Sequence, residues 1–347
     1  MYFDEKIQEI ANKRKDPWEL TNWINRHKLP ATETIKYNSQ LCLSPESLWD
    51  ALHGTFNTAQ NCPINIDILN KIDHKLVSLW NPFSKEEFKQ AIVKCNDSSA
   101  PRPDKLLWRH LKSIVKQDEY LVNIINIANA CINLGHWPNY FKCSSMIIIP
   151  KPNKLSYDQV KMFHSIVLLN TLGKLTEKVI TERVQFIVAK NNFIHLCQLG
   201  RLKHKSTIDA GVALTHIVRS GWTKGKTTST LAFDILQFFP SLNYHLLMSI
   251  LYKADLEPKV ATFFANYLVQ RKTNYVWNNL QSPDFEVNIG VEQESALSPI
   301  FSTLYLTPFF YILEKQLLNL NISISMLSFV DDGLIIAQNR TLLSLNS

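Results

Sequence analysis

Glycine is scarce in this sequence. The chain has 9 glycines in 347 residues, where an average usage of about 7% predicts roughly 24. Tight turns and close approaches of the backbone to a ligand usually need glycine. The sequence also has no apolar run near the ~18 residues of a membrane span, and its first residues show no signal-peptide pattern. These absences argue against a membrane-spanning or secreted protein and favour an intracellular one.

Cysteine is present, but without any metal-binding or disulfide pattern. No two of the six cysteines stand in a C-x-x-C spacing. Their scatter argues against a zinc site and a disulfide framework, and it fits a reducing compartment. The six residues are Cys42, Cys62, Cys95, Cys131, Cys143 and Cys197.

Positive charge is concentrated in one stretch. Between Lys142 and Lys205 there are 11 Lys or Arg against 3 Asp or Glu, a balance of +8, while the whole chain carries +7. The rest of the chain is therefore close to neutral. Such a block is typical of a surface that binds phosphate or nucleic acid. A solvated, lysine-rich face is an equally good interpretation on charge alone.

The order of predicted elements indicates an α+β fold. Helices and strands do not alternate regularly, as they would in a doubly wound sheet. The helical patterns cover residues 5–28, 45–56, 84 onward, 105–116, 119–134, 171–190, 206–220, 243–253, 258–269 and 298–318. The strand-like patterns cover residues 145–150, 228–233, 274–277, 285–289, 324–330 and 334–338.

Carboxylates follow two of the predicted strands. Asp234 ends the strand over 228–233, which we expect to be buried, and Asp331-Asp332-Gly333 joins the last two strands. If the strands are neighbours, three carboxylates converge and repel one another unless a cation lies between them. Mg²⁺ suits oxygen ligands and substrate phosphates. The alternative is an ordinary Asp-Gly hairpin turn and an unrelated strand-end acid.

The order of seven short segments resembles the reverse transcriptase domain of non-LTR (LINE-type) retrotransposons. Each segment is a weak signal alone, but the order and the spacing make the set specific. The last two segments resemble the family's G-x-P-Q-G-S-x-L-S-P loop and its F/Y-x-D-D hairpin. The segments are residues 99–104, 146–154, 165–178, 205–210, 231–239, 290–299 and 329–332.

The resemblance implies catalytic residues and cofactors. Asp234, Asp331 and Asp332 would hold two Mg²⁺ ions for nucleotidyl transfer. Phe239 would lie under the sugar of the incoming nucleotide and exclude a 2′-hydroxyl, and Gln293 would lie beside the nascent base pair. The alternatives are a core aromatic for Phe239 and a surface turn residue for Gln293.

The resemblance also implies partners. The expected partners are an RNA template, a DNA primer and dNTPs, in the nucleus or the cytoplasm. Lys151 and Lys154 would contact the template or the triphosphate, the alternative being a solvated lysine pair. The basic block would then grip the nucleic-acid backbone without reading its sequence.

Several positions depart from the family pattern. Arg102 and Glu294 stand where the family has Gly, Glu292 lies beside Gln293, and His164-Ser165 replaces Arg-Pro. A neutral His cannot make the bidentate phosphate contact of Arg. Most of these replacements correspond to single transitions, which leads to the hypothesis of a relic copy decayed by directional mutation.

The resemblance divides the chain into a helical N-terminal extension (1–97) and a reverse transcriptase domain (98–347). Within this domain we expect fingers over about 98–225 and a palm over about 226–347, with the thumb missing because the sequence stops soon after Asp332. Three interpretations remain open: an RNA-directed DNA polymerase that is impaired in this copy; a catalytically inactive nucleic-acid-binding remnant; or an incomplete gene model.

Overall fold

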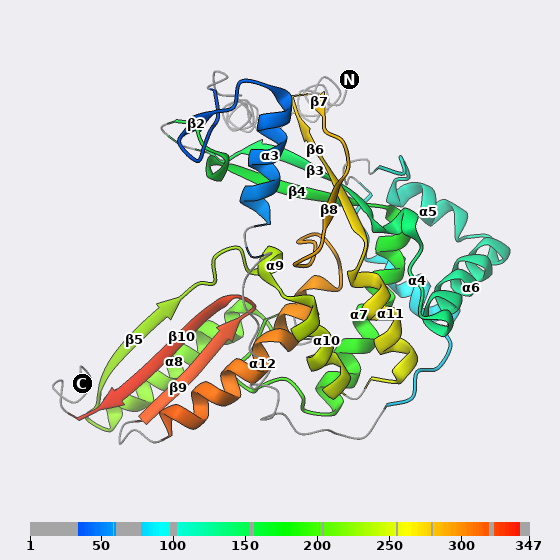
Figure 1. Ribbon diagram of the computed structural model, residues 1–347. Coiled ribbons are helices and arrows are strands. Elements are labelled where there is room, and N and C mark those ends of the chain that lie inside the picture. Colours follow the sequence, from blue (N-terminus) through cyan, green and yellow to red (C-terminus); the bar gives the residue numbers. More distant parts are fainter. Residues whose placement is uncertain are drawn as a thin grey trace, which may run out of the picture. The chain divides into compact units, whose positions relative to one another are not determined.

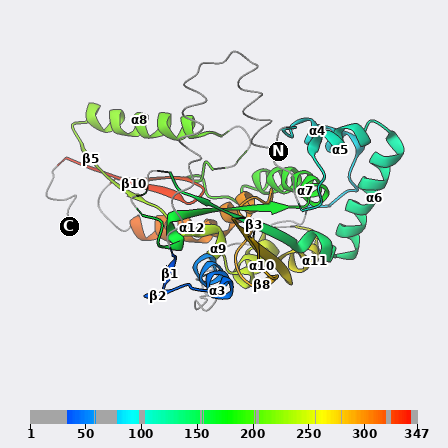
Figure 2. The same ribbon diagram turned by 90° about the horizontal axis from the view of Figure 1, so that it is seen from above.

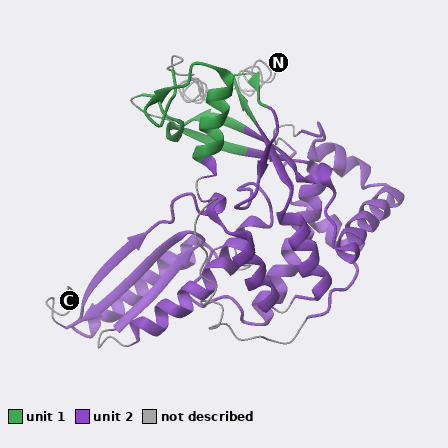
Figure 3. Cartoon of the chain, in the orientation of Figure 1, with its two compact units in different colours: residues 1–55, 147–166, 275–282 green, residues 56–146, 167–274, 283–347 purple. Residues whose placement is uncertain are grey.

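The computed structural model describes most of the chain as two compact units (Figure 3). Unit 1 comprises residues 1–55, 147–166 and 275–282, and unit 2 comprises 56–146, 167–274 and 283–347. The helix predicted over 5–28 lies outside the described part. The described residues are 34–57, 59, 78–97, 103–152, 154, 156–200, 202, 205–254, 256–278, 280–318 and 323–340.

Unit 1 is assembled from three separated segments of the chain. It contains the hairpin of β1 (Lys36–Tyr37) and β2 (Gln40–Leu41), and nearly all of α3 (Pro45–Phe56). The helix starts as predicted, because the Ser44 hydroxyl accepts a hydrogen bond from the Ser47 amide at 3.2 Å. Neither unit has a boundary at residue 97 or 225, so the division into extension, fingers and palm stays a prediction.

The larger of the sheets has five strands. Its strand order is β4-β3-β6-β7, and β8 pairs with β6. The predicted strand over 145–150 is confirmed within β3. The strands are β3 (Cys143–Pro150), β4 (Phe163–Leu169), β6 (Arg271–Trp277), β7 (Leu280–Gln281) and β8 (Phe285–Val287).

Helices build the main hydrophobic core of unit 2. The predicted bounds of α7 agree with the structure, and Leu175, Ile180 and Val184 are completely buried along it. Short turns at Asn139–Lys142, Val160–Met162 and α9 (Phe238–Ser241) connect the larger elements of the chain. The helices around this core are α4 (Lys85–Val93), α5 (Trp108–Ile114), α6 (Asp118–Leu134), α7 (Thr171–Lys190), α10 (Tyr244–Lys253), α11 (Pro258–Leu268) and α12 (Ser298–Leu317).

A separate three-stranded antiparallel sheet lies in unit 2, in the order β5-β10-β9 (Figure 1). Its strands are β5 (Thr227–Phe233), β9 (Ser323–Phe329) and β10 (Asp332–Asn339). α8 (Thr207–Thr223) runs along one face of this sheet (Figure 2). The helix is fixed to the sheet because Gln338 Nε2 donates to the carbonyl of Ile217 at 2.9 Å.

The expectation of a buried strand over 228–233 is wrong. β5 pairs only with β10 and forms an edge of its sheet. Thr230, Leu231 and Ala232 are exposed, and 63% of Leu231 is accessible. The apolar run therefore reflects strand propensity more than burial.

The sequence Ser84-Lys-Glu-Glu87 predicts a capping box at the start of a helix, and the N-terminus of α4 shows it. Ser84 Oγ accepts from the Glu87 amide at 3.3 Å, while Glu87 Oε2 accepts from the Ser84 amide at 2.8 Å. Glu87 also accepts from Arg183 Nη2 of α7 at 2.7 Å, and the Arg183 guanidinium lies 4.3 Å from the Phe83 ring centre. One carboxylate thus caps α4 and fixes it to α7.

Replacing the cap residue should reduce stability in a specific order. We predict that Ser84→Ala lowers the free energy of unfolding by about 1 kcal/mol, whereas Ser84→Gly lowers it by only a few tenths, because Gly tolerates the N-cap conformation. Urea unfolding followed by circular dichroism measures both. A smaller loss for Ala than for Gly would contradict the cap.

Candidate active site

The register of the β5-β10 pair brings two carboxylates together. Phe233 lies opposite Gly333 in this antiparallel pair. Asp234 follows Phe233 and Asp332 precedes Gly333, so each aspartate is the residue next to this last pair of the ladder. Two of the three predicted carboxylates therefore lie at the same end of the sheet, where the pairing of β5 with β10 stops.

The hairpin turns at Val330 and Asp331. The predicted hairpin is present, but β10 begins at Asp332, so only Asp331 of the predicted connection over Asp331, Asp332 and Gly333 lies in the turn. Gly333 is a strand residue, and a Cβ there would overlap the Phe233 ring. The glycine thus serves close packing between paired strands, which removes the Asp-Gly-turn interpretation of this motif.

The negative charges of Asp234 and Asp332 both act on Asp331. Its side chain is partly buried, while Asp234 and Asp332 are exposed. Burial raises the pKa of Asp331, and the negative charges of Asp332 and Asp234 raise it further, while a hydrogen bond from its own backbone opposes this. The charges of Asp234 and Asp332 therefore both act on the Asp331 carboxyl group, with burial as the larger influence.

The donor set fits a hard divalent cation in chemistry. Carboxylate oxygens suit Mg²⁺, which keeps water or substrate phosphates as its other ligands. Within the described residues, no group of three or more His, Cys, Asp or Glu side chains is arranged as a ready ligand set. The protein therefore offers two aspartates at the paired ends of β5 and β10 and a third at the turn, and other ligands would have to complete the coordination.

Phe239 and the loop that begins at Gly290 lie side by side. The Gly290 amide donates to the Leu242 carbonyl, and the Val291 amide to the Phe239 carbonyl, both at 2.8 Å. Gly290 has φ +73°, and a Cβ there would lie 2.6 Å from Pro240 Cα. The retained glycine is needed for this approach, and Phe239 itself is partly buried against the main core.

A buried glutamate anchors the loop that carries Gln293. Gln293 is exposed, whereas Glu177 of α7 is 2% exposed. Glu177 accepts hydrogen bonds from Tyr267 Oη at 2.9 Å, from Ser295 Oγ at 2.9 Å and from the Ala296 amide at 3.1 Å. Burial raises the pKa of Glu177, and these hydrogen bonds oppose the rise. The network fixes the loop just beyond Gln293.

Both glutamates beside Gln293 have electrostatic partners. Glu294 lies 3.6 Å from Lys174 Nζ. Burial raises the pKa of Glu292 to about 7; the Arg271 charge opposes the rise, and the Glu177 charge adds to it. The fold therefore accommodates two acidic side chains in a loop where the family pattern has none.

The basic block is only partly a free surface. Lys142 is 3% exposed, and its Nζ has no hydrogen-bond partner. Burial and the nearby Arg271 charge lower the pKa of Lys142. Arg183 is engaged with Glu87. The expectation that the basic block over 142–205 contacts the nucleic-acid backbone is thus corrected at these two residues.

Other predicted residues lie in unit 1 or outside the described part. The Lys151 ammonium donates to the Lys161 carbonyl at 2.8 Å, and the side chains of Lys154 and His164 are exposed. Arg102 lies outside the described residues. The predicted residues in unit 1 are Lys151, Lys154, His164 and Ser165.

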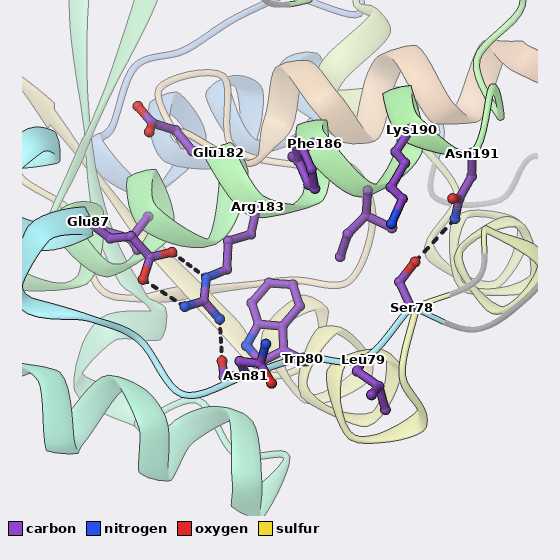
Figure 4. Close-up of a pocket in the computed structure, with 12 residues that line it drawn as sticks. Ser78, Leu79, Trp80, Asn81, Glu87, Glu182, Arg183, Phe186, Lys190 and Asn191 are labelled. Atoms are coloured by element: carbon purple, nitrogen blue, oxygen red, sulfur yellow. Dashed lines mark hydrogen bonds and ion pairs between the residues drawn. The ribbon is translucent and has the colours of Figure 1, made fainter.

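A cavity of about 780 Å³ lies along α7 and the segment 78–81 (Figure 4). Trp80, Phe186 and the Arg183–Glu87 pair contribute to its wall. None of the predicted site residues lines it. The cavity is therefore not part of the site formed by the aspartates.

Sequence reasoning missed three buried residues near the site, Glu177, Gln198 and Gly200. Glu177 lies in the segment 165–178 that resembles the family, but the resemblance did not assign it a function. Gln198 contacts residues 130 and 132 positions later in the chain. No local sequence pattern predicts such a contact. The retention of Gly200 in a chain with few glycines is the one feature of the sequence that indicates close packing near Gln198.

Comparison with known proteins identifies the class. The family described as reverse transcriptase (RNA-dependent DNA polymerase) matches residues 149–345, and the chain belongs to this family. Its reverse transcriptase domain is a distant relative of non-LTR retrotransposon enzymes, as the motifs predict. No helix in the described part is both long and apolar enough to span a membrane.

Particular relatives come from mobile elements of flies. The chain is 26% identical over 228 residues to the RNA-directed DNA polymerase from mobile element jockey of Drosophila funebris, which covers 65% of this chain and 24% of the relative. It is 23% identical over 224 residues to the probable RNA-directed DNA polymerase from transposon X-element of Drosophila melanogaster, with the same coverage of 65% and 24%. The chain thus spans about a quarter of the length of these relatives.

Glu292 should make stability depend on pH. Because its pKa is raised from 4.5 to about 7, the folded state binds a proton more tightly than the unfolded state does. The group therefore lowers stability as the pH rises through this window, by on the order of 3 kcal/mol at most. We predict that Glu292→Gln removes this component, measured by urea unfolding between pH 4.5 and 7.5.

The matched control is Glu286→Gln, an exposed glutamate in β8. This variant should keep the wild-type pH dependence. Equal pH profiles for the wild type and Glu292→Gln would contradict the burial of the Glu292 carboxyl group.

Proposed function

We propose that this chain is the polymerase part of a non-LTR retrotransposon reverse transcriptase, of impaired activity, which extends a DNA primer on an RNA template with dNTPs. In this proposal the β5-β10-β9 sheet is the palm, and the segments around β3 and β4 belong to the fingers. The observation that carries the proposal is the pairing of Phe233 with Gly333, which leaves Asp234 and Asp332 at the same end of the ladder, with Asp331 at the adjoining turn.

The proposed chemistry assigns separate tasks to the side chains of unit 2. Two Mg²⁺ ions, when bound, stabilise the attacking and leaving oxygens of phosphoryl transfer. Asp234, Asp331 and Asp332 would hold them. Phe239 would limit the space beside the nucleotide sugar, supported by the hydrogen bond that joins its carbonyl to Val291.

The nascent base pair would lie against the loop that carries Gln293. The three hydrogen bonds accepted by Glu177 support a fixed position for this loop. Lys151 and Lys154 would contact the template or the triphosphate. These two lysines belong to unit 1, and their role rests on the motif alone.

A second candidate is a catalytically inactive nucleic-acid-binding remnant. Glu294 favours it, because an exposed carboxylate beside Gln293 places negative charge where primer and nucleotide phosphates would approach. His164 and Ser165 also favour it, since neither can replace a bidentate Arg contact. A loss of a few kcal/mol of transition-state stabilisation corresponds to a factor of hundreds in rate.

Primer extension separates the two candidates. We predict Mg²⁺-dependent extension of a DNA primer on an RNA template by the wild type, reduced by at least about a hundredfold in Asp331→Ala, because several kcal/mol of charge stabilisation are lost. Asp284→Ala, which removes an exposed aspartate between β7 and β8, is the control and should stay active. Wild-type extension no greater than that of Asp331→Ala supports the remnant instead.

Repair of the departures should raise activity. We predict that Glu294→Gly together with His164→Arg increases primer extension by at least about tenfold, because a repulsive charge is removed and a phosphate ligand is restored. The paired measurement is circular dichroism, which reports whether the repaired protein is folded. A folded but unimproved double variant would contradict the assignment of these two positions as the damaged ones.

A further inference from the structure

The residue before Asp331 has an unusual backbone conformation. Val330 has φ +62° and is 7% exposed. A β-branched side chain rarely adopts positive φ unless the surrounding structure imposes it. In the described part of the chain, the other non-glycine residues with positive φ are unbranched at Cβ: Asn38, Ser39, Lys105, Asn192, Gln237, Gln270 and Asn278.

The side chain of Gln198 makes hydrogen bonds to both backbone groups of Val330. Gln198 is 2% exposed. Its Oε1 accepts from the Val330 amide at 3.0 Å and from the Gly200 amide at 2.8 Å. Its Nε2 donates to the Val330 carbonyl and to Ser328 Oγ, both at 3.1 Å. Gln198 therefore satisfies both backbone groups of Val330 at the turn.

The backbone around Gln198 is itself attached to the end of β9. The Leu199 amide donates to the Ser328 carbonyl, and the Ser328 amide donates to the Cys197 carbonyl, both at 2.8 Å. Gly200 completes the fit, because a Cβ at this position would lie 2.7 Å from Val330 Cγ2. The segment thus forms a rigid support against which the turn is held.

We propose that Gln198 is a positioning residue, which together with Gly200 holds Val330 at positive φ and thereby sets the direction of Asp331 and Asp332. The catalytic part of this inference rests on the proposed function. The conformational part does not, because it concerns the turn alone. Without the side chain of Gln198, Val330 relaxes to negative φ and the carboxylates lose their common orientation.

The test uses a variant that removes the hydrogen bonds but keeps the volume, Gln198→Met. Val330→Gly is the rescue, because glycine adopts positive φ without the support of Gln198. The matched control is Gln338→Met, which removes a buried glutamine of β10 that bonds to Ile217 and Thr228, away from the turn. The wild type, the three single variants and the Gln198→Met/Val330→Gly double variant complete the set.

Hydrogen–deuterium exchange of the peptide over residues 328–333 reads the turn directly. We expect Gln198→Met to accelerate this exchange by about tenfold or more. Val330→Gly in the same chain should restore it to within a few-fold of the wild type, and Gln338→Met should leave it unchanged. Unchanged exchange in Gln198→Met, or no restoration by Val330→Gly, overturns the proposal.

Primer extension then measures the effect of Gln198→Met on catalysis. Gln198→Met should lower kcat by on the order of a hundredfold, the cost of misplaced catalytic groups, with the KM for dNTP little changed. The double variant should recover part of kcat. A loss confined to KM overturns the positioning role.

The two readouts keep the proposals apart. If the wild-type chain extends no primer, the proposed function fails, while the exchange experiment still decides whether Gln198 holds the turn. If the chain is active and Gln198→Met is equally active, the positioning role fails and the polymerase stands.

Discussion

The pairing of β5 with β10 is the constraint on which the rest of this sheet depends, because it brings the strand ends next to Asp234 and Asp332 together. The turn adds Asp331, whose pKa is raised by burial and, less strongly, by the charges of the other two aspartates. A cation shared by such carboxylates would relieve their repulsion. The surrounding structure supports this arrangement locally: Gly333 admits the Phe233 ring, and Gln198 holds the turn. These features favour a functional origin for the carboxylates.

The loop beside Gln293 is subject to different demands from folding and from chemistry. Glu177 supports the loop through Tyr267, Ser295 and Ala296, and this support does not involve the side chains of the altered positions. Glu294 forms an ion pair with Lys174, so the fold tolerates the acidic replacement. A substitution can thus satisfy packing and still oppose an incoming phosphate.

Local chemistry explains what the sequence predicts well. The bounds of α7 and the capping box at Ser84 follow from periodicity and from hydrogen bonds three residues apart. The meeting of Asp234 with Asp332 could be expected only through the hypothesis that β5 and the hairpin are neighbours. That hypothesis came from apolar strands ending in acids, and the register bears it out.

Long-range contacts explain what the sequence does not predict. The turn at Val330 depends on Gln198, far away in the chain, so the Asp-Gly pair misleadingly indicates the turn. The exposure of Leu231 depends on the edge position of β5, which no local pattern reports. The burial of Lys142 likewise depends on tertiary packing, which no local pattern reports. Glycine scarcity itself becomes informative only at particular positions, since Gly200, Gly290 and Gly333 each remain where a Cβ would collide.

Binding of Mn²⁺ to the free protein, followed by electron paramagnetic resonance, tests most directly whether the three aspartates form a cation site. We predict that the wild type binds Mn²⁺, that Mg²⁺ displaces it, and that Asp234→Asn weakens the binding by at least about tenfold, because a carboxylate ligand is lost. Equal Mn²⁺ affinity in the wild type and in Asp234→Asn would contradict the assignment of these carboxylates to a shared cation site.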